Sequence, residues 1–440
     1  MDRRNFVKTG AAAAIGGIAL DALPLRAVPA SSKAPIRIGL IGCGGRGTGA
    51  AVQALSTNQD VQLVAMADAF ADRVDDSYRN LINTAEDSWS GGVDLTPRID
   101  VPEERRFAGF DAYMQVLPLV DVVILATPPG FRPIHFKAAI EANKHVFMEK
   151  PVATDGPGVR SVLESAAMAK SRNLNVVVGL QRRYQNIYTE WVDRIHAGII
   201  GDVILGRVYW NDAGVWVRER QPGQTEMEYQ MRNWYYFTWL CGDHIVEQHI
   251  HNLDVANWVL GDSHPVRAQG QGGRLLRNGP DHGEIFDHHM VEFEYEGGAR
   301  VLSQCRHMPN TARRVSEAFH GTNGTAPRPG QLVSASGHSL MEYDADGDPN
   351  PYQVEHDELF AAIAAGEFKF SDAERGARAS MTAIMGRMAT YSGQIVEWDE
   401  ALGSNLSIMP ERYDFNANPP IMPDANGRYP VAQPGVTQSY

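Results

Sequence analysis

The stretch from Gly242 to Asp254 places a histidine between two carboxylates at a spacing suited to acid/base chemistry. We expect it to form one helix with Asp243 near its N-terminus, where a carboxylate can cap free backbone N–H groups. In that helix Glu247, His251 and Asp254 stand at positions i, i+4 and i+7 and share one face. His251 would then exchange a proton with a substrate, while the carboxylates orient the imidazole and the substrate hydroxyl groups.

A metal site is the alternative interpretation of this stretch, because His244, Glu247, His249 and His251 are all potential ligands. The spacing argues against it. The usual zinc-binding helix motifs are missing, and His249 and His251 stand about 200° apart around a helix. We therefore predict that no metal binds here and that His244 and His249 are structural.

A glycine-rich turn predicts the element that holds the second reactant. The apolar run 36–41 leads into glycines at the G-x-G-x-x-G positions, Gly42, Gly44 and Gly47, and small residues follow. This pattern is typical of a strand, a tight turn and a helix. The first glycine makes the turn, the second lets a pyrophosphate approach the backbone, and the third lets the helix pack closely on the strand.

The next apolar run ends at a carboxylate that supports a dinucleotide site. Residues 62–67 read as a second buried strand, and Asp68 follows at the distance where a carboxylate accepts hydrogen bonds from the adenosine ribose. A carboxylate there would repel a 2'-phosphate. We therefore predict NAD, with NADP as the alternative because Arg73 lies close by.

Alternating apolar and helical segments predict a doubly wound parallel sheet. After an irregular, polar surface insertion at 85–109, strands are expected at 120–127, 145–148 and 176–179, with helices at 135–142 and 155–170. Ligands of such sheets lie beyond the carboxyl ends of the strands. The expected cofactor contacts are Gly42, Gly44, Gly45, Arg46, Gly47, Asp68, Thr127, Pro128, His135, Glu149 and Lys150.

Lys150 is the second candidate for proton transfer, since it directly follows the expected strand 145–148. Partial burial and a nicotinamide ring that is cationic when oxidised would lower its pKa from about 10.4 toward neutrality, so that it relays an alcohol proton. The alternative is a surface lysine before a structural proline.

The second half of the chain changes to antiparallel strand patterns. Strands are expected at 202–210, 287–295 and 299–306, and Glu296-Gly297-Gly298 joins the last two as a hairpin. Helices are expected at 355–365 and 372–391. We predict a second α/β domain with a large, mostly antiparallel open sheet, followed by an extended tail. An aromatic-rich segment, 229–239, suits either the apolar faces of sugar rings or core packing.

Four motifs together resemble the Gfo/Idh/MocA family of sugar and inositol oxidoreductases. They are Gly42-Cys43-Gly44-Gly45-Arg46-Gly47, Ala126-Thr127-Pro128-Pro129, 144–151 with its Glu-Lys-Pro, and His251-Asn252-Leu253-Asp254. The resemblance implies a Rossmann domain at 34–180, a substrate domain at 181–413 and a tail at 414–440.

The same resemblance implies further roles. Substrate would lie between the domains, with Lys150 and His251 catalytic and Arg183, Tyr184, Glu247 and Asp254 binding the sugar, polyol or inositol. The large sheet would form homo-oligomer contacts. Glu247 and His249 stand where the family usually has Asp and Gly, which alters the expected pocket. Some relatives are redox-neutral glycosidases, so hydrolysis or epimerisation through a keto-sugar is an alternative to net oxidation, as is a non-catalytic carbohydrate-binding protein.

Composition and the N-terminus complete the prediction. The net charge of −13 argues against a nucleic-acid surface, which needs clustered Lys and Arg. Arg3 and Arg4 precede a short apolar run, which resembles a twin-arginine export signal over 1–33 without a stable membrane anchor. Three cysteines suggest neither a disulfide framework nor a cysteine zinc site. Because the periplasm offers no free NAD pool, we expect a tightly held cofactor.

Overall fold

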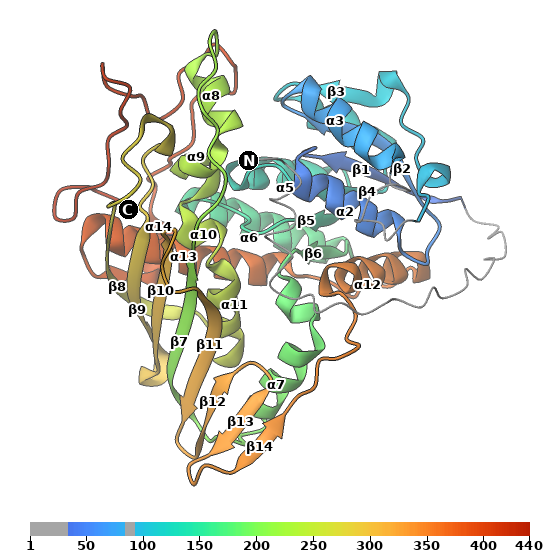
Figure 1. Ribbon diagram of the computed structural model, residues 1–440. Coiled ribbons are helices and arrows are strands. Elements are labelled where there is room, and N and C mark those ends of the chain that lie inside the picture. The colour runs from blue at the N-terminus through green and yellow to red at the C-terminus, as the bar shows by residue number, and fades with distance from the viewer. Residues whose placement is uncertain (1–33, 84–92) are drawn as a thin grey trace.

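The computed structural model describes residues 34–83 and 93–440, so the predicted leader at 1–33 lies outside the described residues (Figure 1). Two sheets organise this part of the chain. A six-stranded sheet lies in the N-terminal half, and a nine-stranded sheet is formed from the second half. The α/β class and the order of the two sheets agree with the prediction. The exact domain boundaries stay a prediction.

The first sheet is entirely parallel, with strand order β3-β2-β1-β4-β5-β6. Its strands are β1 (Ile36–Ile41), β2 (Val61–Asp68), β3 (Arg106–Ala108), β4 (Val122–Leu125), β5 (His145–Met148) and β6 (Val176–Val178). The order reverses at β1, and β1 and β4 are neighbours there. Ligands of doubly wound sheets bind at such a switch point, beyond the strand ends.

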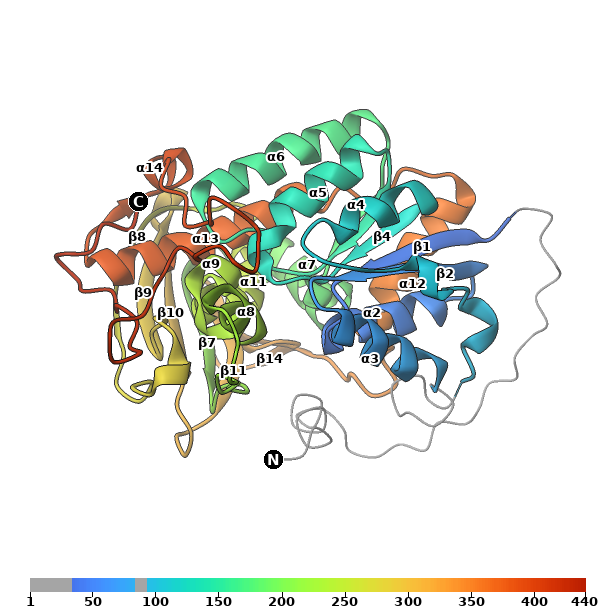
Figure 2. The same ribbon diagram turned by 90° about the horizontal axis from the view of Figure 1, so that it is seen from above.

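Helices cover both faces of this sheet, as Figure 2 shows. On one side lie α2 (Gly45–Leu55) and α3 (Ala71–Ile82), and on the other α4 (Ala112–Val116), α5 (Arg132–Glu141) and α6 (Gly156–Ser171). Strand β4 is buried along its whole length, as its unbroken apolar run predicted. Asp155 caps α6, since its carboxylate accepts a hydrogen bond from Gly158 N at 2.8 Å.

The prediction that 85–109 is wholly irregular was wrong at its end. Arg106–Ala108 forms the edge strand β3, where Met66 of β2 pairs with Arg106. An edge strand pairs on one side only and needs no apolar run, so the polar sequence around it concealed it.

The second sheet has the order β14-β13-β12-β11-β7-β10-β9-β8-β15, and every neighbouring pair is antiparallel except β7 with β10. Its strands are β7 (Val203–Asp212), β8 (Pro265–Gly273), β9 (His288–Tyr295), β10 (Arg300–His307), β11 (Arg314–Gly321), β12 (Gly324–Arg328), β13 (Gln331–Ser334), β14 (Ser339–Glu342) and β15 (Val396–Glu397). The predicted hairpin joins β9 to β10. Val291, Phe293 and Tyr295 are buried on the helix-facing side, as their alternation indicated.

Helices pack between and beside the two sheets. They are α7 (Asn186–His196), α8 (Glu226–Arg232), α9 (Thr238–Cys241), α10 (His244–Glu247), α11 (Ile250–Val259), α12 (Pro351–Ala365), α13 (Ala373–Ser392) and α14 (Trp398–Gly403). Helix α13 packs on both β8 and α6 and so joins the two halves, while α12 packs on α2. Within the described ranges, no helix is both long and apolar enough to cross a bilayer.

The prediction of one continuous helix from Gly242 to Asp254 was wrong. Helix α10 ends at Glu247, and α11 begins at Ile250 after a turn at Gln248 and His249. The N–H of His249 reaches back five residues to the carbonyl of His244 at 3.1 Å, which breaks the regular ladder. Asp243 does cap α10, because its carboxylate accepts from His244 N. Glu247 and His251 therefore come from different short helices.

Candidate active site

The glycine turn between β1 and α2 has the form of a dinucleotide cradle. Gly42 has φ +100, and a Cβ there would lie 2.4 Å from the backbone nitrogen of Thr127. A Cβ at Gly47 would lie 1.9 Å from the carbonyl oxygen of Gly42, so only glycine permits this helix–turn packing. A Cβ at Gly44 or Gly45 would meet no atom within 4 Å.

Open space above Gly44 and Gly45 faces the start of α2, whose first turn has no acidic residue and whose N-cap Gly44 offers no side-chain hydrogen bond. The N–H groups at a helix start and its dipole attract an anion. The residues present therefore fit the pyrophosphate of a dinucleotide.

Asp68 ends β2, as predicted. Its carboxylate accepts hydrogen bonds from the backbone N–H groups of Cys43 at 2.7 Å and of Phe70 at 3.1 Å. Burial raises its pKa, and the two backbone donors and Arg73 oppose that rise. The hydrogen bond from Cys43 thus holds Asp68 beside the glycine turn, where its carboxylate would accept hydrogen bonds from a ribose diol.

Residues at the end of β4 are held by an arginine that sequence reasoning did not identify. Arg132 is fully buried, and its guanidinium donates to the carbonyls of Leu125, Thr127 and Glu149 at 2.8–2.9 Å. Burial lowers its pKa to about 10. Arg132 thereby fixes the ends of β4 and β5 side by side. The only sequence signal was its place just after the Thr-Pro-Pro segment.

His135 and Pro128 lie at the same strand end. The His135 ring contacts Thr127 Oγ1 at 3.2 Å, and burial lowers the pKa of His135 to about 3, so it is neutral. Pro128 directly precedes the short turn that leads into α5. These predicted cofactor contacts are brought together at the switch point beside the glycine turn.

Arg46 and Glu149, also predicted cofactor contacts, pair with each other. Arg46 Nε donates to Glu149 Oε1 at 2.5 Å, and its Nη2 lies 3.5 Å from Glu355 Oε1 of α12. Glu355 is completely buried, and burial raises its pKa well above the ordinary value. The pair connects the start of α2 to β5 and α12.

Lys150 connects the two halves of the molecule at the end of β5. Its ammonium donates to the carbonyl oxygen of Glu247 at 2.7 Å and to Glu247 Oε1 at 3.0 Å. An ammonium has three N–H groups, so one is left for a substrate oxygen. The second carboxylate oxygen, Glu247 Oε2, is buried and has no hydrogen-bond partner among the described residues.

His251 lies close enough for the charge of Lys150 to act on it. Burial, first, and then the positive charges of Lys150 and Arg182 hold the pKa of His251 well below its ordinary value. The imidazole is therefore neutral at physiological pH. Its Nδ1 is buried without a hydrogen-bond partner in the described part of the chain, and the indole of Trp210 stacks on the ring at 6.0 Å.

Lys150, Glu247 and His251 thus form a centre with one ammonium and two buried polar atoms that have no hydrogen-bond partner among the described residues, Glu247 Oε2 and His251 Nδ1. Buried polar groups in folded proteins are nearly always paired, so these two atoms need a partner such as an ordered water or a ligand. Trp210 of β7 was missed from the sequence, because nothing near it in the chain links it to His251.

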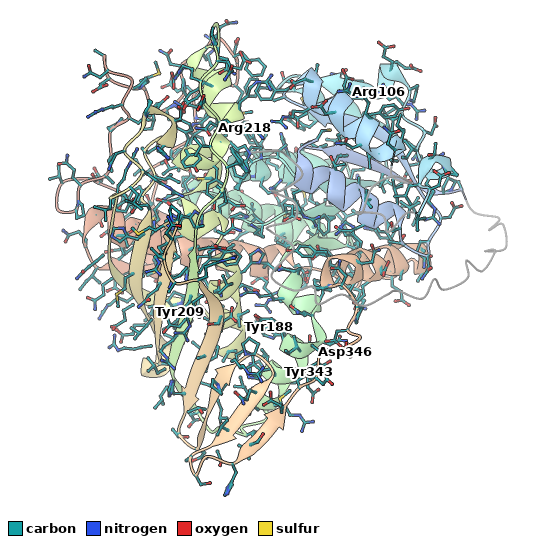
Figure 3. All side chains as sticks on the ribbon, in the orientation of Figure 1. Arg106, Tyr188, Tyr209, Arg218, Tyr343 and Asp346 are labelled. Atoms are coloured by element: carbon teal, nitrogen blue, oxygen red, sulfur yellow. The ribbon has the colours of Figure 1, made fainter. Side chains whose placement is uncertain are left out.

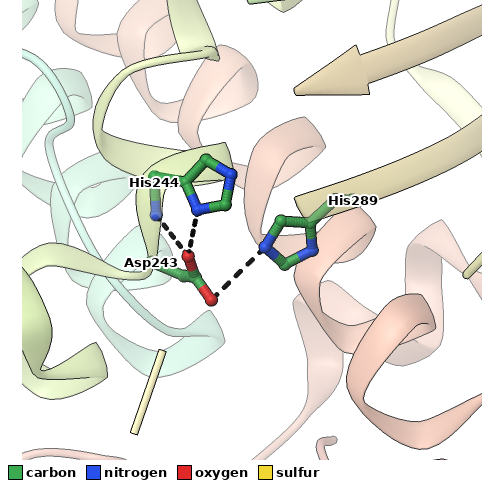
Figure 4. Close-up of side chains that lie close together, drawn as sticks. All are labelled: Asp243, His244 and His289. Carbon is green, nitrogen blue, oxygen red and sulfur yellow. Dashed lines mark hydrogen bonds and ion pairs between the residues drawn. The ribbon is translucent and has the colours of Figure 1, made fainter. Parts of the chain in front are cut away.

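Asp243, His244 and His289 form a separate, fully buried cluster (Figure 4). The Asp243 carboxylate accepts from the backbone N–H of His244 at 2.5 Å, and the His244 ring lies 2.7 Å from it. It also accepts from Phe286 N and the Tyr391 hydroxyl and lies 3.3 Å from His289 Nε2. Burial raises the pKa of Asp243, but the two imidazoles lower it more, to well below the ordinary value.

These three side chains could also surround a cation, a set that sequence spacing did not suggest. Four hydrogen bonds and the nearby His289 ring already surround the carboxylate, which accounts for its burial. His249, the other histidine expected to be structural, contacts Ser303 Oγ at 2.8 Å, and burial lowers its pKa to about 3.

Arg183 and Asp254, predicted to bind substrate, are paired with each other. Arg183 donates to both carboxylate oxygens of Asp254 at 2.8 and 2.9 Å, and both side chains are almost completely buried. Asp262 also faces the guanidinium at 2.8 Å. Tyr184 donates its hydroxyl to Asp372. The structure therefore places Arg183 and Asp254 in a buried ion pair and Tyr184 in a hydrogen bond with Asp372.

We expect Asp254→Asn to destabilise the fold by about 3 kcal/mol, because among the described carboxylates it leaves the buried Arg183 paired with the half-exposed Asp262 alone. Urea unfolding measures the loss. The matched control is Glu190→Gln, which breaks an exposed pair with Arg194 and should cost less than about 1 kcal/mol. A raised KM for sugar with unchanged stability would instead support substrate binding.

The fold and this centre define a two-domain oxidoreductase whose N-terminal domain binds a dinucleotide. Residues 36–180 match the model of the oxidoreductase family with an NAD-binding Rossmann fold, and residues 188–326 match the Gfo/Idh/MocA C-terminal domain. The chain belongs to the Gfo/Idh/MocA family, and its Rossmann domain is an NAD-binding one.

Curated relatives match this chain at low identity. The inositol 2-dehydrogenase of Rhizobium meliloti (strain 1021) is 25% identical over 347 residues, which is 75% of this chain and 89% of that protein. Inositol 2-dehydrogenase 3 of Saccharopolyspora erythraea is 31% identical over 182 residues. That match covers 41% of this chain and 46% of the relative.

Solved structures share the fold. The scyllo-inositol dehydrogenase of Lactobacillus casei with bound NAD(H) and scyllo-inositol has a TM-score of 0.59 at 17% identity, covering 83% of this chain and 99% of that one. The aldose-aldose oxidoreductase of Caulobacter crescentus also has a TM-score of 0.59, at 18% identity, with 83% and 100% covered.

Proposed function

We propose that this oxidoreductase transfers hydride between nicotinamide and a carbon that bears a hydroxyl group in a sugar, polyol or inositol. The observation that carries the proposal is the meeting of Lys150, from the NAD-binding domain, with Glu247 beside His251, from the second domain. Its matched relatives include inositol 2-dehydrogenases, which supports a polyhydroxylated ring as substrate.

Bound NAD in its oxidised form would supply the hydride acceptor, and the hydroxyl proton of the carbinol has to leave as the carbonyl forms. His251 is neutral and has an unsatisfied ring nitrogen, so it accepts that proton. The free N–H of Lys150 donates to the same oxygen and stabilises the charge that develops on it. Glu247 holds the ammonium in place and offers its second oxygen to a neighbouring hydroxyl.

Denaturing the purified protein without added cofactor tests the proposal. We expect close to one nicotinamide nucleotide per chain. The absorbance of the bound nucleotide should then change when a hexose or inositol is added to the native protein. Unchanged absorbance with every hexose and cyclitol would contradict the proposed chemistry.

We also propose that the cofactor is held tightly, because the C-terminal segment packs on the loops that follow β2, β3 and β4. Phe415 contacts Phe70 and Phe110 with ring centroids 5.2 and 4.7 Å apart, and Tyr413 contacts Phe110 and Phe131 at 6.2 and 5.6 Å. Phe70 stands two residues after Asp68, on the predicted adenosine side. We therefore expect this segment to slow the release of the nucleotide.

Replacing Phe415 with Ala should speed the release of nucleotide about tenfold, since it removes two ring contacts, each worth about 0.5–1.5 kcal/mol beyond area burial. Exchange of bound nucleotide against labelled NAD measures the release rate. Phe368→Ala, at a partly exposed phenylalanine outside this cluster, is the matched control. An unchanged rate in Phe415→Ala would show that the tail does not retain the cofactor.

Export by the twin-arginine route remains a proposal based on residues 1–33.

A homo-oligomer formed through the nine-stranded sheet is a separate proposal. Helices α11 and α13 pack on one face of that sheet, and Met290, half exposed, belongs to the opposite face. That face also carries the Arg300–Glu292 ion pair.

A further inference from the structure

Arg182 is a buried arginine just beyond the last strand of the first sheet. It belongs to the short helix η6 (Gln181–Tyr184), which follows β6, and only 8% of the residue is exposed. Three residues earlier, Gly179 lies against a carboxylate of β5's end, since a Cβ at Gly179 would be 2.8 Å from Glu149 Oε2. Arg182 thus follows the strand end that lies beside Glu149 and Lys150.

Glu317 of β11 is the anion that pairs with this arginine. Arg182 Nη1 donates to Glu317 Oε1, and the Arg182 guanidinium lies 5.4 Å from the centre of the Tyr188 ring. Tyr188 of α7, which Figure 3 labels, donates its hydroxyl to Glu317 Oε2 at 3.0 Å. Glu317 is completely buried, so its charge needs these partners.

Asn252 links the Arg182–Glu317 pair to the candidate base. Its side-chain amide donates to Glu317 Oε1 at 2.5 Å, and Asn252 directly follows His251 on α11. Strand β7, which pairs with β11, carries Trp210, the indole that stacks on the His251 ring. Glu317 therefore anchors the residue after His251, while the neighbouring strand packs a ring on the imidazole itself.

Packing alone does not require an ion pair at this position. Burial of two charges costs desolvation, and apolar residues of similar volume often replace such a pair without loss of stability. A cation has a specific effect here, because Arg182 is close enough to act on His251. After burial and the charge of Lys150, the charge of Arg182 is the next cause that lowers the pKa of His251.

The elements around His251 carry both signs of charge. Their charged and titratable groups are Lys150 after β5, Glu247 of α10, His249 in the turn before α11, Arg182 of η6, Tyr188 of α7 and Glu317 of β11. Helix α13 meets α11 through an uncharged contact between Asn257 and Thr382. Glu247 is paired with Lys150, and Glu317 with Arg182.

We propose that Arg182 is a positioning residue of the reaction: through Glu317 and Asn252 it fixes the start of α11, and it places a permanent cation beside the His251 imidazole. A guanidinium does not lose its proton in proteins, so it opposes protonation of the base at every working pH. The inference rests on the proposed function for the role of His251 as base.

The double variant Arg182→Met/Glu317→Gln tests the charge without leaving a buried ion unpaired. We expect the acid limb of kcat/KM, measured with the hexose or inositol that is oxidised, to move up by roughly one pH unit. The sign follows because removal of a cation makes His251 easier to protonate. Arg182→Lys keeps the cation and should keep the wild-type limb, and Glu317→Gln alone should not move the limb upward.

Arg194→Met/Glu190→Gln is the matched control, since it removes an exposed ion pair from α7 and should leave the acid limb in place. Melting curves show whether each variant is folded. Should the double variant not fold, Arg182→Gln keeps an amide donor for Glu317 and carries the same expected shift. An unmoved limb in a folded variant without the cation, or an equal upward shift in Arg182→Lys, would overturn the proposal.

Histidine NMR keeps this inference apart from the proposed chemistry. The ring signal of His251, identified by its loss in His251→Gln, reports protonation without any substrate. If no sugar is oxidised but this signal titrates at a higher pH in the double variant than in the wild type, the hydride chemistry fails and the effect of Arg182 on His251 stands. If a sugar is oxidised and both the limb and the signal keep their wild-type pH, the chemistry stands and the inference fails.

Discussion

Replacing Lys150 with Met should lower turnover about 10²- to 10⁴-fold while the purified variant keeps its nucleotide. Methionine preserves the length and apolar contacts of the side chain but removes the ammonium that contacts Glu247 at 3.0 Å. The developing oxyanion would lose its donor, and the buried Glu247 carboxylate would lose its cation. Stopped-flow absorbance of the bound nucleotide, with nucleotide content measured after denaturation, gives both quantities.

Lys137→Met is the matched control, because Lys137 is exposed on α5 and contacts none of the centre. It should keep wild-type turnover. If Lys150→Met retains nucleotide and loses less than about tenfold in turnover, Lys150 is a structural lysine and the assignment is wrong.

His251→Ala should cause a loss of the same order, and the wild-type pH profile should show why. Burial and the positive charges of Lys150 and Arg182 lower the pKa of His251, and His249, itself neutral near pH 7, lies close by as well. A base whose pKa is lowered stays deprotonated to a lower pH. The acid limb of kcat/KM should therefore lie well below about 6.5, the ordinary histidine value.

Gly44→Val should reduce the nucleotide content of the purified protein at least about tenfold, equivalent to about 1.4 kcal/mol, without destabilising the apoprotein. Gly44 has φ −76 and ψ −178, a conformation that valine adopts readily, and a Cβ there would meet no atom within 4 Å. The valine side chain therefore fits the apoprotein, but it would occupy the space that a pyrophosphate takes at the helix N-terminus.

Gly403→Val is the control for this substitution, since its Cβ also points into open space but at the end of α14. It should keep its nucleotide. Gly47→Ala, where a Cβ would lie 1.9 Å from the Gly42 carbonyl, should instead lower the melting temperature. A Gly44→Val variant with full nucleotide content would contradict the cradle.

Local patterns in the sequence were sufficient for the elements that depend on neighbouring residues. The turn at Gly42, the cap at Asp243 and the β9–β10 hairpin each rest on backbone preferences of a few adjacent residues, and all three form as predicted. The buried strand β4 followed from its unbroken apolar run.

Contacts between distant residues decided the rest. Lys150 meets Glu247 across 97 residues, and Arg46 approaches Glu355 across 309. The expected helix face of Glu247, His251 and Asp254 does not exist, because the chain turns at Gln248 and Asp254 pairs with Arg183. A periodic pattern reports which face of a helix is apolar, but it does not report which partner lies opposite.

The sequence by itself therefore determined the class of the fold, the dinucleotide turn and the residue types of the centre. Only the tertiary structure decided which of those residues face one another and which are neutral. The physical reason is that pairing and pKa depend on burial and on charges brought close in space, as Lys150 and Arg182 are to His251.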